Sequence, residues 1–315
     1  AIFAYNSRQW AIVDFALMML EAVTVPFYHG LIGSELNKYL ELVEIKMACV
    51  NTLEQYHLLK NLPEDKQITG PIVVFNENTQ ILDTDFHYSD FLKMGRERLD
   101  GEIIEYEEIF MGGDENHIIT LMFSSGTSAR RPSPVKLTHK NILTNIVEIK
   151  ALVGADITDK DRAVSFLPMS HILARTGDLY SSLVMKHEIY FIPSMDDLID
   201  FLPKVSPTLL VFVPRVLEKI HDAIFAKASP TLQKVLTFAL KMSDRFHKSK
   251  HIGKLPYAIW HYLFKAVIYR KIINKIGKDL RFIVTGGAPI TLKVESFFYN
   301  IGIEILSGYG LTETS

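Results

Sequence analysis

Hydroxyl side chains and a glycine are concentrated at Ser124–Ser128, whose sequence is SSGTS. The apolar run Ile118–Phe123 precedes them and predicts a buried strand, and a helix is expected to start at Thr138 after a stretch of cations and prolines. Glycine lets a backbone approach an oxyanion, hydroxyl and free N–H groups donate hydrogen bonds to it, and nearby positive charge offsets a polyanion. The stretch therefore predicts a phosphate-binding loop, although a surface turn has a similar composition.

Two common nucleotide motifs are missing from the sequence. It contains no GxxxxGK[ST] loop and no GxGxxG loop. A Walker-type phosphate loop, a Rossmann dinucleotide site and a kinase loop are therefore not indicated.

Two more loops follow apolar runs that predict strands. The loop Gly286–Ile290 (GGAPI) has two glycines, which allow a flat base to lie against the backbone. The loop Ser307–Thr314 offers an aromatic face at Tyr309, a hydroxyl at Thr312 and a carboxylate suited to Mg²⁺ at Glu313. Core packing of Tyr309 and an exposed loop acid at Glu313 remain the alternatives. Ligands of open parallel sheets bind at the carboxyl ends of the strands, so the three loops together predict a nucleoside triphosphate site.

The elements that must position these loops alternate along the chain. Short apolar runs that predict strands are separated by helical patterns, which favours an α/β fold with mostly parallel sheets flanked by helices. The stretch Val216–Gly277 is helical in pattern, with breaks near Pro230 and at Gly253–Pro256. Its basic part, Lys227–Lys278, has two interpretations, a solvated helical face or a membrane patch. No domain boundary is evident.

Composition sets further limits. The chain has 315 residues and a formal net charge of −2, so it has no general attraction for nucleic acid. Cys49 is its single cysteine, which excludes an internal disulfide and fits a reducing, cytoplasmic compartment. No apolar run reaches the ~18 residues of a spanning helix. The first residue is not Met, which suggests a fragment or a trimmed chain.

Several of these stretches together resemble one known family. The order SSGTS, LTHKN, LPMSH, GGAP and GYGLTET is similar to that of the adenylate-forming (AMP-binding) enzymes. The opening AIFAYNSRQWAI with VTVPFY, and FVPRVLEKI before a long helical insert, resemble the long-chain fatty acid–CoA ligases in particular. The resemblance covers nearly the whole chain and implies that residues 1–315 are part of the large N-terminal domain, with the insert at about 216–278.

The resemblance implies a two-step reaction. A fatty acid carboxylate attacks the α-phosphate of ATP, and the thiol of CoA then displaces AMP from the acyl-adenylate. Thr312 would contact the α-phosphate, Glu313 would bind Mg²⁺, and His171 would lie near the carboxylate at the mouth of an acyl tunnel. The implied ATP-binding residues are Ser124, Ser125, Gly126, Thr127, Ser128, Gly287, Ala288, Pro289, Gly308, Tyr309, Gly310 and Thr312.

The sequence departs from the family at the phosphate loop. The last loop glycine is replaced by Ala129, the usual lysine falls on Ser133, and the following glycine falls on Pro134. Arg130 or Arg131 could supply the charge, but arginine is not a simple substitute for lysine. Weakened triphosphate binding and a sequence error at this point both remain open.

Other functions compatible with the sequence are a fatty acyl-AMP ligase with a non-CoA acceptor and an inactive homologue that binds acyl chains or a partner. The family's ribose-binding aspartate and catalytic lysine lie downstream of Ser315, in or near a small C-terminal domain. We therefore expect little ligase activity from these 315 residues alone. The sequence does not indicate acyl chain length or oligomeric state.

Overall fold

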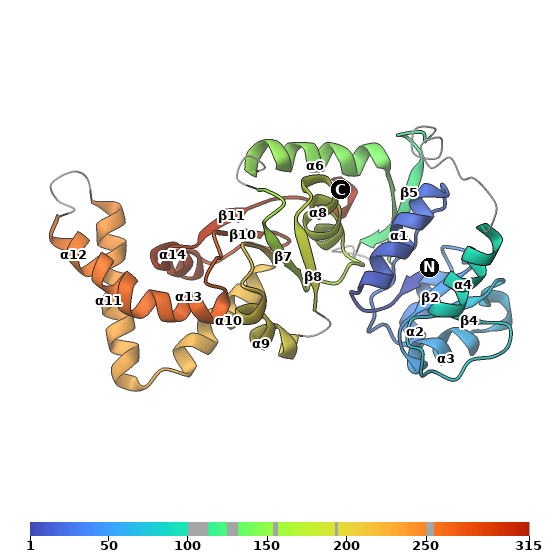
Figure 1. Cartoon of the computed structure of the whole chain (residues 1–315), viewed down its shortest axis with the longest axis horizontal. Helices are drawn as coiled ribbons and strands as arrows, with labels where there is room; N and C mark the ends of the chain where they lie inside the picture. The colour runs from blue at the N-terminus through green and yellow to red at the C-terminus, as the bar shows by residue number, and fades with distance from the viewer. Residues whose placement is uncertain (100–112, 125–131, 154–156, 193–194, 250–254, 315) are drawn as a thin grey trace. The chain divides into compact units, whose positions relative to one another are not determined.

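The chain divides into two compact units. Unit 1 comprises Ala1–Ile149, Pro168–Thr176 and Thr312–Ser315, and unit 2 comprises Lys150–Leu167 and Gly177–Leu311. The sequence did not reveal this division. Figure 1 labels most of the helices and strands of the whole chain. The structure is a computed structural model, which describes residues 1–99, 113–124, 132–153, 157–192, 195–249 and 255–314.

Unit 1 contains a parallel sheet and an antiparallel strand pair. The parallel sheet has the order β1-β2-β3-β4, and β5 pairs with β6 in the antiparallel direction. The segment Thr24–Phe27 joins the two, because Leu121 N donates to Thr24 O at 2.9 Å and Phe27 N donates to Ile2 O at 2.9 Å. The strands are β1 (Ile2–Phe3), β2 (Ala48–Val50), β3 (Ile72–Val74), β4 (Phe86–His87), β5 (Ile118–Ser124) and β6 (Ser133–Thr138).

Local sequence signals start several helices of unit 1. Thr52 caps α3 in a reciprocal pair, since Gln55 N donates to Thr52 Oγ1 at 3.2 Å and Thr52 N donates to Gln55 Oε1 at 3.1 Å. Ser7 caps α1 by accepting from Trp10 N at 3.1 Å. The helices are α1 (Arg8–Met19), α2 (Gly33–Leu40), α3 (Leu53–Lys60), α4 (Tyr88–Leu99), most of α6 (His139–Val153) and α7 (Ile172–Ala174).

Unit 2 contains a five-stranded parallel sheet in the order β11-β10-β9-β7-β8. The strands are β7 (Arg162–Ser165), β8 (Glu188–Phe191), β9 (Leu209–Phe212), β10 (Phe282–Thr285) and β11 (Glu304–Ser307). All four residues of β9 are buried, as expected for an inner strand covered on both faces. Two ion pairs link the start of β7 to the residues just before β10. Arg162 Nη2 lies 2.9 Å from Asp279 Oδ2, and Arg281 Nη2 lies 2.7 Å from Asp161 Oδ1. The mostly parallel α/β class predicted from the sequence is thereby confirmed.

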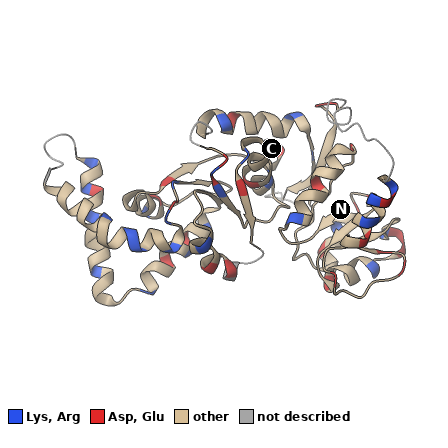
Figure 2. Ribbon diagram, viewed as in Figure 1, with Lys and Arg blue, Asp and Glu red and all other residues tan. Residues whose placement is uncertain are grey.

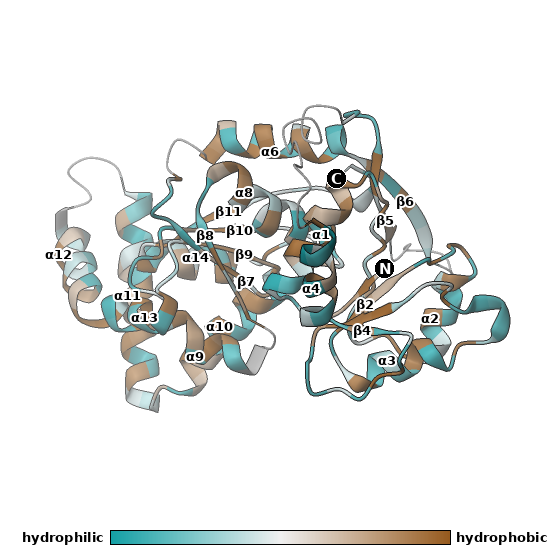
Figure 3. Cartoon of the chain, turned by 45° about the vertical axis from the view of Figure 1, so that its right-hand side comes forward, coloured by the Kyte–Doolittle hydropathy of each residue, from teal (hydrophilic) through white to brown (hydrophobic). Residues whose placement is uncertain are grey.

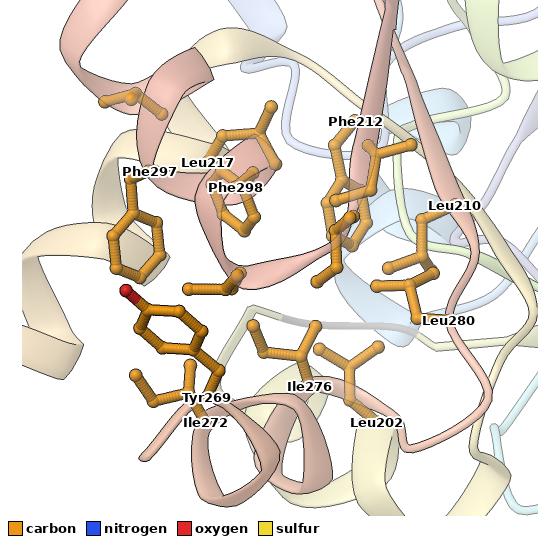
Figure 4. Close-up of a cluster of buried hydrophobic side chains, with 14 of the residues drawn as sticks. Leu202, Leu210, Phe212, Leu217, Tyr269, Ile272, Ile276, Leu280, Phe297 and Phe298 are labelled. Carbon is orange, nitrogen blue, oxygen red and sulfur yellow. The ribbon is translucent and has the colours of Figure 1, made fainter. Parts of the chain in front are cut away.

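Helices separate the strands of this sheet along the chain. They are α8 (Ser181–Met185), α9 (Met195–Val205), α10 (Pro214–Ala226), α11 (Pro230–Lys248), α12 (Leu255–Phe264), α13 (Arg270–Ile276) and α14 (Leu292–Ile301), together with the π-helical segments η3 (Arg175–Tyr180) and η5 (Lys265–Tyr269). Figure 4 shows Leu210 and Phe212 of β9 packing with Phe298 of α14 and Ile276 of α13 in one hydrophobic core.

The long helical stretch was predicted correctly, but it consists of separate helices. The expected break at Pro230 is the start of α11, where Ser229 caps the helix and Pro230 occupies its first turn. Gly253 and Lys254 of the second expected break lie outside the described residues, and its other two residues, Leu255 and Pro256, are the first two residues of α12. No helix among the described residues has the length and apolar character needed to cross a bilayer.

Candidate active site

Strand β5 carries the start of the predicted phosphate loop. Ile119, Thr120 and Met122 of this strand are buried, and the strand ends at Ser124 opposite Ser133 of β6. Ser125, Gly126, Thr127 and Ser128, like Ala129, Arg130 and Arg131, lie outside the described residues. The strand therefore holds the first residue of the loop at its carboxyl end, as the sequence predicted.

Strand β6 was not predicted. Its six residues form an antiparallel partner for β5, and the pairing continues across Pro134, which lies opposite Phe123 between the pairs Met122–Val135 and Ser124–Ser133. Among the described strands, β6 pairs with β5 alone, so it is an edge strand, where proline is tolerated. Ser133, at the position of the family's lysine, is exposed.

The helix after β6 begins where it was predicted. Asn141 N donates to Thr138 Oγ1 at 3.2 Å, and Thr138 N donates to Asn141 Oδ1 at 2.9 Å. This reciprocal cap is a local signal, which explains why the sequence showed the helix start although it did not show the strand before it.

Thr312 and Glu313 lie beside the phosphate-loop strand. They belong to the short 3₁₀ helix η6 (Thr312–Thr314), which contacts both β5 and β6. Asn145 of α6 also holds this helix, because its Nδ2 donates to Thr314 O at 3.1 Å. Unit 1 thus brings the segment of Thr312 and Glu313 next to β5, although nearly 190 residues separate this segment from Ser124 in the chain.

Glu313 is suited to a magnesium ion that is shared with phosphate. Its side chain is exposed, and no group of three His, Cys, Asp or Glu side chains gathers as a metal site in the part of the chain that the structure describes. Mg²⁺ is commonly held by one or two carboxylates with water and substrate phosphates, so a single carboxylate beside a phosphate loop fits this ion.

His171 lies on the turn between β7 and α7. Its N–H donates to Pro168 O at 2.9 Å, and its ring centroid is 6.5 Å from that of Tyr28. The side chain is exposed, yet the surrounding protein lowers the pKa of His171 by desolvation. The lowered pKa disfavours the charged imidazolium, so this ring is better suited to offer a hydrogen bond than a charge.

A buried arginine fixes the segment that carries His171. Arg175 is fully buried; its Nη2 donates to Asp14 Oδ1 at 2.6 Å and its Nη1 donates to Thr120 Oγ1 at 2.6 Å. Thr120 Oγ1 donates in turn to Thr24 O at 2.8 Å, and the guanidinium lies 5.4 Å from the Trp10 ring centre. The network ties the His171 segment to α1 and to β5. Sequence reasoning missed Arg175, and Asp14 within the apolar helix α1 was the signal that a buried cation was needed.

The second part of the predicted site lies in unit 2. Strands β10 and β11 are parallel neighbours that end together at Thr285 and Ser307, and Gly308 N donates to Thr285 O at 2.8 Å. Gly287 follows with a φ of +80°, which favours glycine. Gly287, Ala288 and Pro289 are exposed, as are Gly308 and Gly310.

Tyr309 is 94% exposed. This excludes the core-packing interpretation of Tyr309, and it leaves the ring face available to a flat ligand. The two loops that the sequence assigned to adenine therefore leave adjacent strand ends, and the chain continues directly from Tyr309 to Thr312 and Glu313 in unit 1.

Comparisons with known proteins identify the family of the chain. Residues 1–315 match the family described as AMP-binding enzyme. Long-chain-fatty-acid–CoA ligase FadD15 of Mycobacterium bovis is 28% identical over 319 residues, covering 100% of this chain and 51% of the relative. Long chain acyl-CoA synthetase 3 of Arabidopsis thaliana is 27% identical over 328 residues, covering 99% of this chain and 47% of the relative.

Solved structures share the fold. The N-terminal domain of FACL13 from Mycobacterium tuberculosis has a TM-score of 0.63 at 19% identity, over 99% of this chain and 62% of that one. The chain spans about half the length of the curated relatives it matches.

Proposed function

Because the chain belongs to the AMP-binding enzyme family, we propose that it is part of the adenylating domain of a long-chain fatty acid–CoA ligase. The names of the curated relatives support a long-chain fatty acid as the substrate and CoA as the acceptor. The observation that carries the proposal is the position of Thr312 and Glu313 beside β5, at whose end the Ser124–Ser128 loop begins.

Each candidate residue has a role in the first half-reaction. A fatty acid carboxylate oxygen attacks the α-phosphorus of ATP, the bond to the bridging oxygen breaks, and pyrophosphate leaves. Ser124–Ser128 would donate hydrogen bonds to the β- and γ-phosphates, and Thr312 to the α-phosphate. Glu313 would hold Mg²⁺, which when bound offsets the charge that develops on the phosphates. Neutral His171 would position the fatty acid carboxylate without a formal ion pair.

The nucleoside would be held mainly by unit 2. Tyr309 would stack on adenine while Gly287, Ala288 and Pro289 line its edge. An exposed aromatic ring suits this role, because stacking on a base contributes ~1–3 kcal/mol. In the second half-reaction the CoA sulfur attacks the acyl carbon, the bond from that carbon to the AMP oxygen breaks, and the thiol proton goes to solvent.

Palmitate-dependent ATP–pyrophosphate exchange tests the reaction, in the full-length protein that contains this chain. Binding of a non-hydrolysable palmitoyl-adenylate analogue to the 315-residue chain tests the site separately. Tyr309→Ala should weaken analogue binding roughly fivefold to a hundredfold, from the stacking energy. Glu313→Gln should abolish exchange while leaving the fold intact.

Exposed residues of the same types in unit 2 provide matched controls. Tyr299→Ala on α14 and Glu304→Gln at the start of β11 should leave both measurements unchanged. Analogue binding that is insensitive to Tyr309→Ala would contradict the proposed adenine site.

The altered phosphate loop favours one alternative. Ser133 and Pro134 belong to the edge strand β6, where the family has a lysine and a glycine. An inactive homologue would bind the acyl-adenylate analogue but show no exchange. A fatty acyl-AMP ligase with a different acceptor would show exchange but form no thioester when CoA is added.

A further inference from the structure

Charge is distributed very unevenly along the chain. The segment 227–278, called here the basic insert, has twelve lysines and arginines and one acidic residue, Asp244. Because the whole chain has 34 basic and 36 acidic residues, the remainder has 22 basic and 35 acidic residues. Most of the charged positions on α11 and α13 are accordingly blue in Figure 2, whereas α12 itself has no lysine or arginine. A near-neutral protein thus carries a concentrated positive region.

The helices of the basic insert form a well-packed hairpin. Helices α11 and α12 contact each other along their lengths, and the rings of Phe246 and His261 stack at 4.6 Å between centroids. His261 Nδ1 and Ser243 Oγ are hydrogen bonded at 2.9 Å, and Ser243 Oγ and Tyr269 OH at 2.8 Å, all three residues being buried. These three inward polar side chains are therefore hydrogen bonded to one another, and the outward side chains of the two helices form a defined surface.

Large apolar side chains occupy part of that outward surface. The ribbon in Figure 3 shows that α11 and α12 contain both hydrophobic and hydrophilic residues. Phe238 of α11 meets Trp260 of α12 edge to face, with ring centroids 5.9 Å apart, and both are more than 40% exposed. Ile259, 73% exposed, and Leu263, 49% exposed, lie on neighbouring turns of α12. These residues form a patch across both helices, which we call the hairpin patch.

Lysines border the hairpin patch. Lys234 and Lys241 are exposed and lie four residues before and three residues after Phe238, so helical spacing puts all three on one face of α11. Ion pairs neutralise few of the insert's cations: among its described residues, the one pair formed joins Lys248 to Asp244 at 2.9 Å. The basic insert thus presents apolar and aromatic side chains within a field of uncompensated positive charge.

We propose that the hairpin of α11 and α12 is a docking surface for an anionic lipid bilayer. Exposed aliphatic and aromatic side chains insert at the boundary of headgroups and acyl chains, and flanking lysines contact anionic headgroups. A purely solvated face does not account for Ile259 and Leu263. A second copy of the chain is disfavoured, because it would bring two such positive segments together. The inference rests on this surface and not on the proposed ligase reaction.

The chain contains a built-in reporter for this contact. It has two tryptophans, of which Trp10 is 1% exposed in unit 1 and Trp260 lies in the hairpin patch. The 315-residue chain is mixed with vesicles of 30% phosphatidylserine and 70% phosphatidylcholine, with and without brominated acyl chains. Bromines should quench Trp260 and leave Trp10 unaffected, so Trp260→Phe should abolish the quenching. Raising NaCl from 50 to 500 mM should release the protein, because surface attraction falls off within a Debye length.

Paired variants separate the two contributions. Lys234→Glu with Lys241→Glu should lower the partition coefficient at least ~25-fold, at about fivefold per cation. Ile259→Ser with Leu263→Ser should lower it roughly tenfold and reduce the quenching. Leu292→Ser with Lys293→Glu on α14 is the matched control, since both residues are exposed in the same unit, and it should bind as the parent does. Unchanged thermal unfolding of each variant verifies folding.

Several outcomes would overturn the proposal. Equal binding to vesicles of pure phosphatidylcholine would remove the role of charge, and binding without quenching of Trp260 would place the contact elsewhere. The chain could instead fail to bind vesicles and form a dimer in sedimentation velocity experiments. If both pairs of insert variants then prevented dimerisation, the patch would be a contact between copies of the chain. Binding to a heparin fragment without vesicle binding would point to a soluble polyanion instead.

Discussion

Two buried carboxylates, one in each unit, are accommodated differently. Asp14 in unit 1 is fully buried and accepts a hydrogen bond from the Arg175 guanidinium at 2.6 Å. Asp178 in unit 2 is also fully buried, but burial raises its pKa well above the ordinary value, and a hydrogen bond with Ser165 opposes this shift only in part. One carboxylate is matched by a cation, and in the other burial disfavours the ionised form. A buried acid therefore signals a charge network only when a cation is buried with it.

Removing the cation should have the largest effect. Arg175→Met leaves Asp14 buried without its cation, which should lower the free energy of unfolding by about 3–5 kcal/mol. Urea unfolding measures this change. The double variant Arg175→Met with Asp14→Leu should recover most of the loss, because no uncompensated charge remains.

Arg98 provides the control for that comparison. It is exposed on α4, and Arg98→Met should change the unfolding free energy by less than ~0.5 kcal/mol. If Arg175→Met behaved like Arg98→Met, the buried pair would not stabilise unit 1.

The hydroxyl that links Arg175 to β5 should have an intermediate effect. Thr120→Val keeps the shape of the side chain but removes the acceptor for Arg175 Nη1 and the donor to Thr24 O. Leaving these groups without partners should lower the free energy of unfolding, measured in urea, by about 1–3 kcal/mol. Thr144→Val, at an exposed position on α6, serves as the matched control and should leave the free energy of unfolding nearly unchanged. Equal losses for the two variants would show that the hydroxyl contributes nothing specific.

Neutralising the second carboxylate should have the smallest effect and a distinct pH dependence. Asp178 has a raised pKa in the folded chain, so its contribution to stability is complete below the unfolded pKa of ~4 and is lost as pH rises toward the folded pKa. The side chain of the variant Asp178→Asn cannot ionise, so the variant does not lose this stability as pH rises. At pH 4 its unfolding free energy should lie within ~1 kcal/mol of the parent, and the difference should shift in favour of the variant as pH rises to 7.

Unfolding curves collected between pH 4 and 7 test this expectation. Asp200→Asn, at an exposed position on α9, should keep the slope of the parent. A variant at Asp178 whose profile ran parallel to the parent would mean that Asp178 has an ordinary pKa in the folded chain.

Features with a local cause could be predicted from the sequence. The caps at Ser229 and Thr138 use side chains within three residues of the helix start, and the loops at Ser124 and Gly286 follow apolar runs that read as strands. Parallel strands place their ends at one edge, so the pairing of the Gly286–Ile290 and Ser307–Thr314 loops was also expected. The family resemblance agreed with the match over residues 1–315.

Features that depend on distant partners could not be predicted. Strand β6 has a proline at its second position and another just before its start, it has no clear alternation, and its conformation comes from pairing with β5. Arg175 is indistinguishable from a surface arginine until Asp14 and Thr120 are brought to it from 161 and 55 residues away. The different environments of Asp14 and Asp178 could not be predicted for the same reason. The sequence specifies which groups can ionise, whereas the packed structure decides whether a group of opposite charge lies close enough to pair with them.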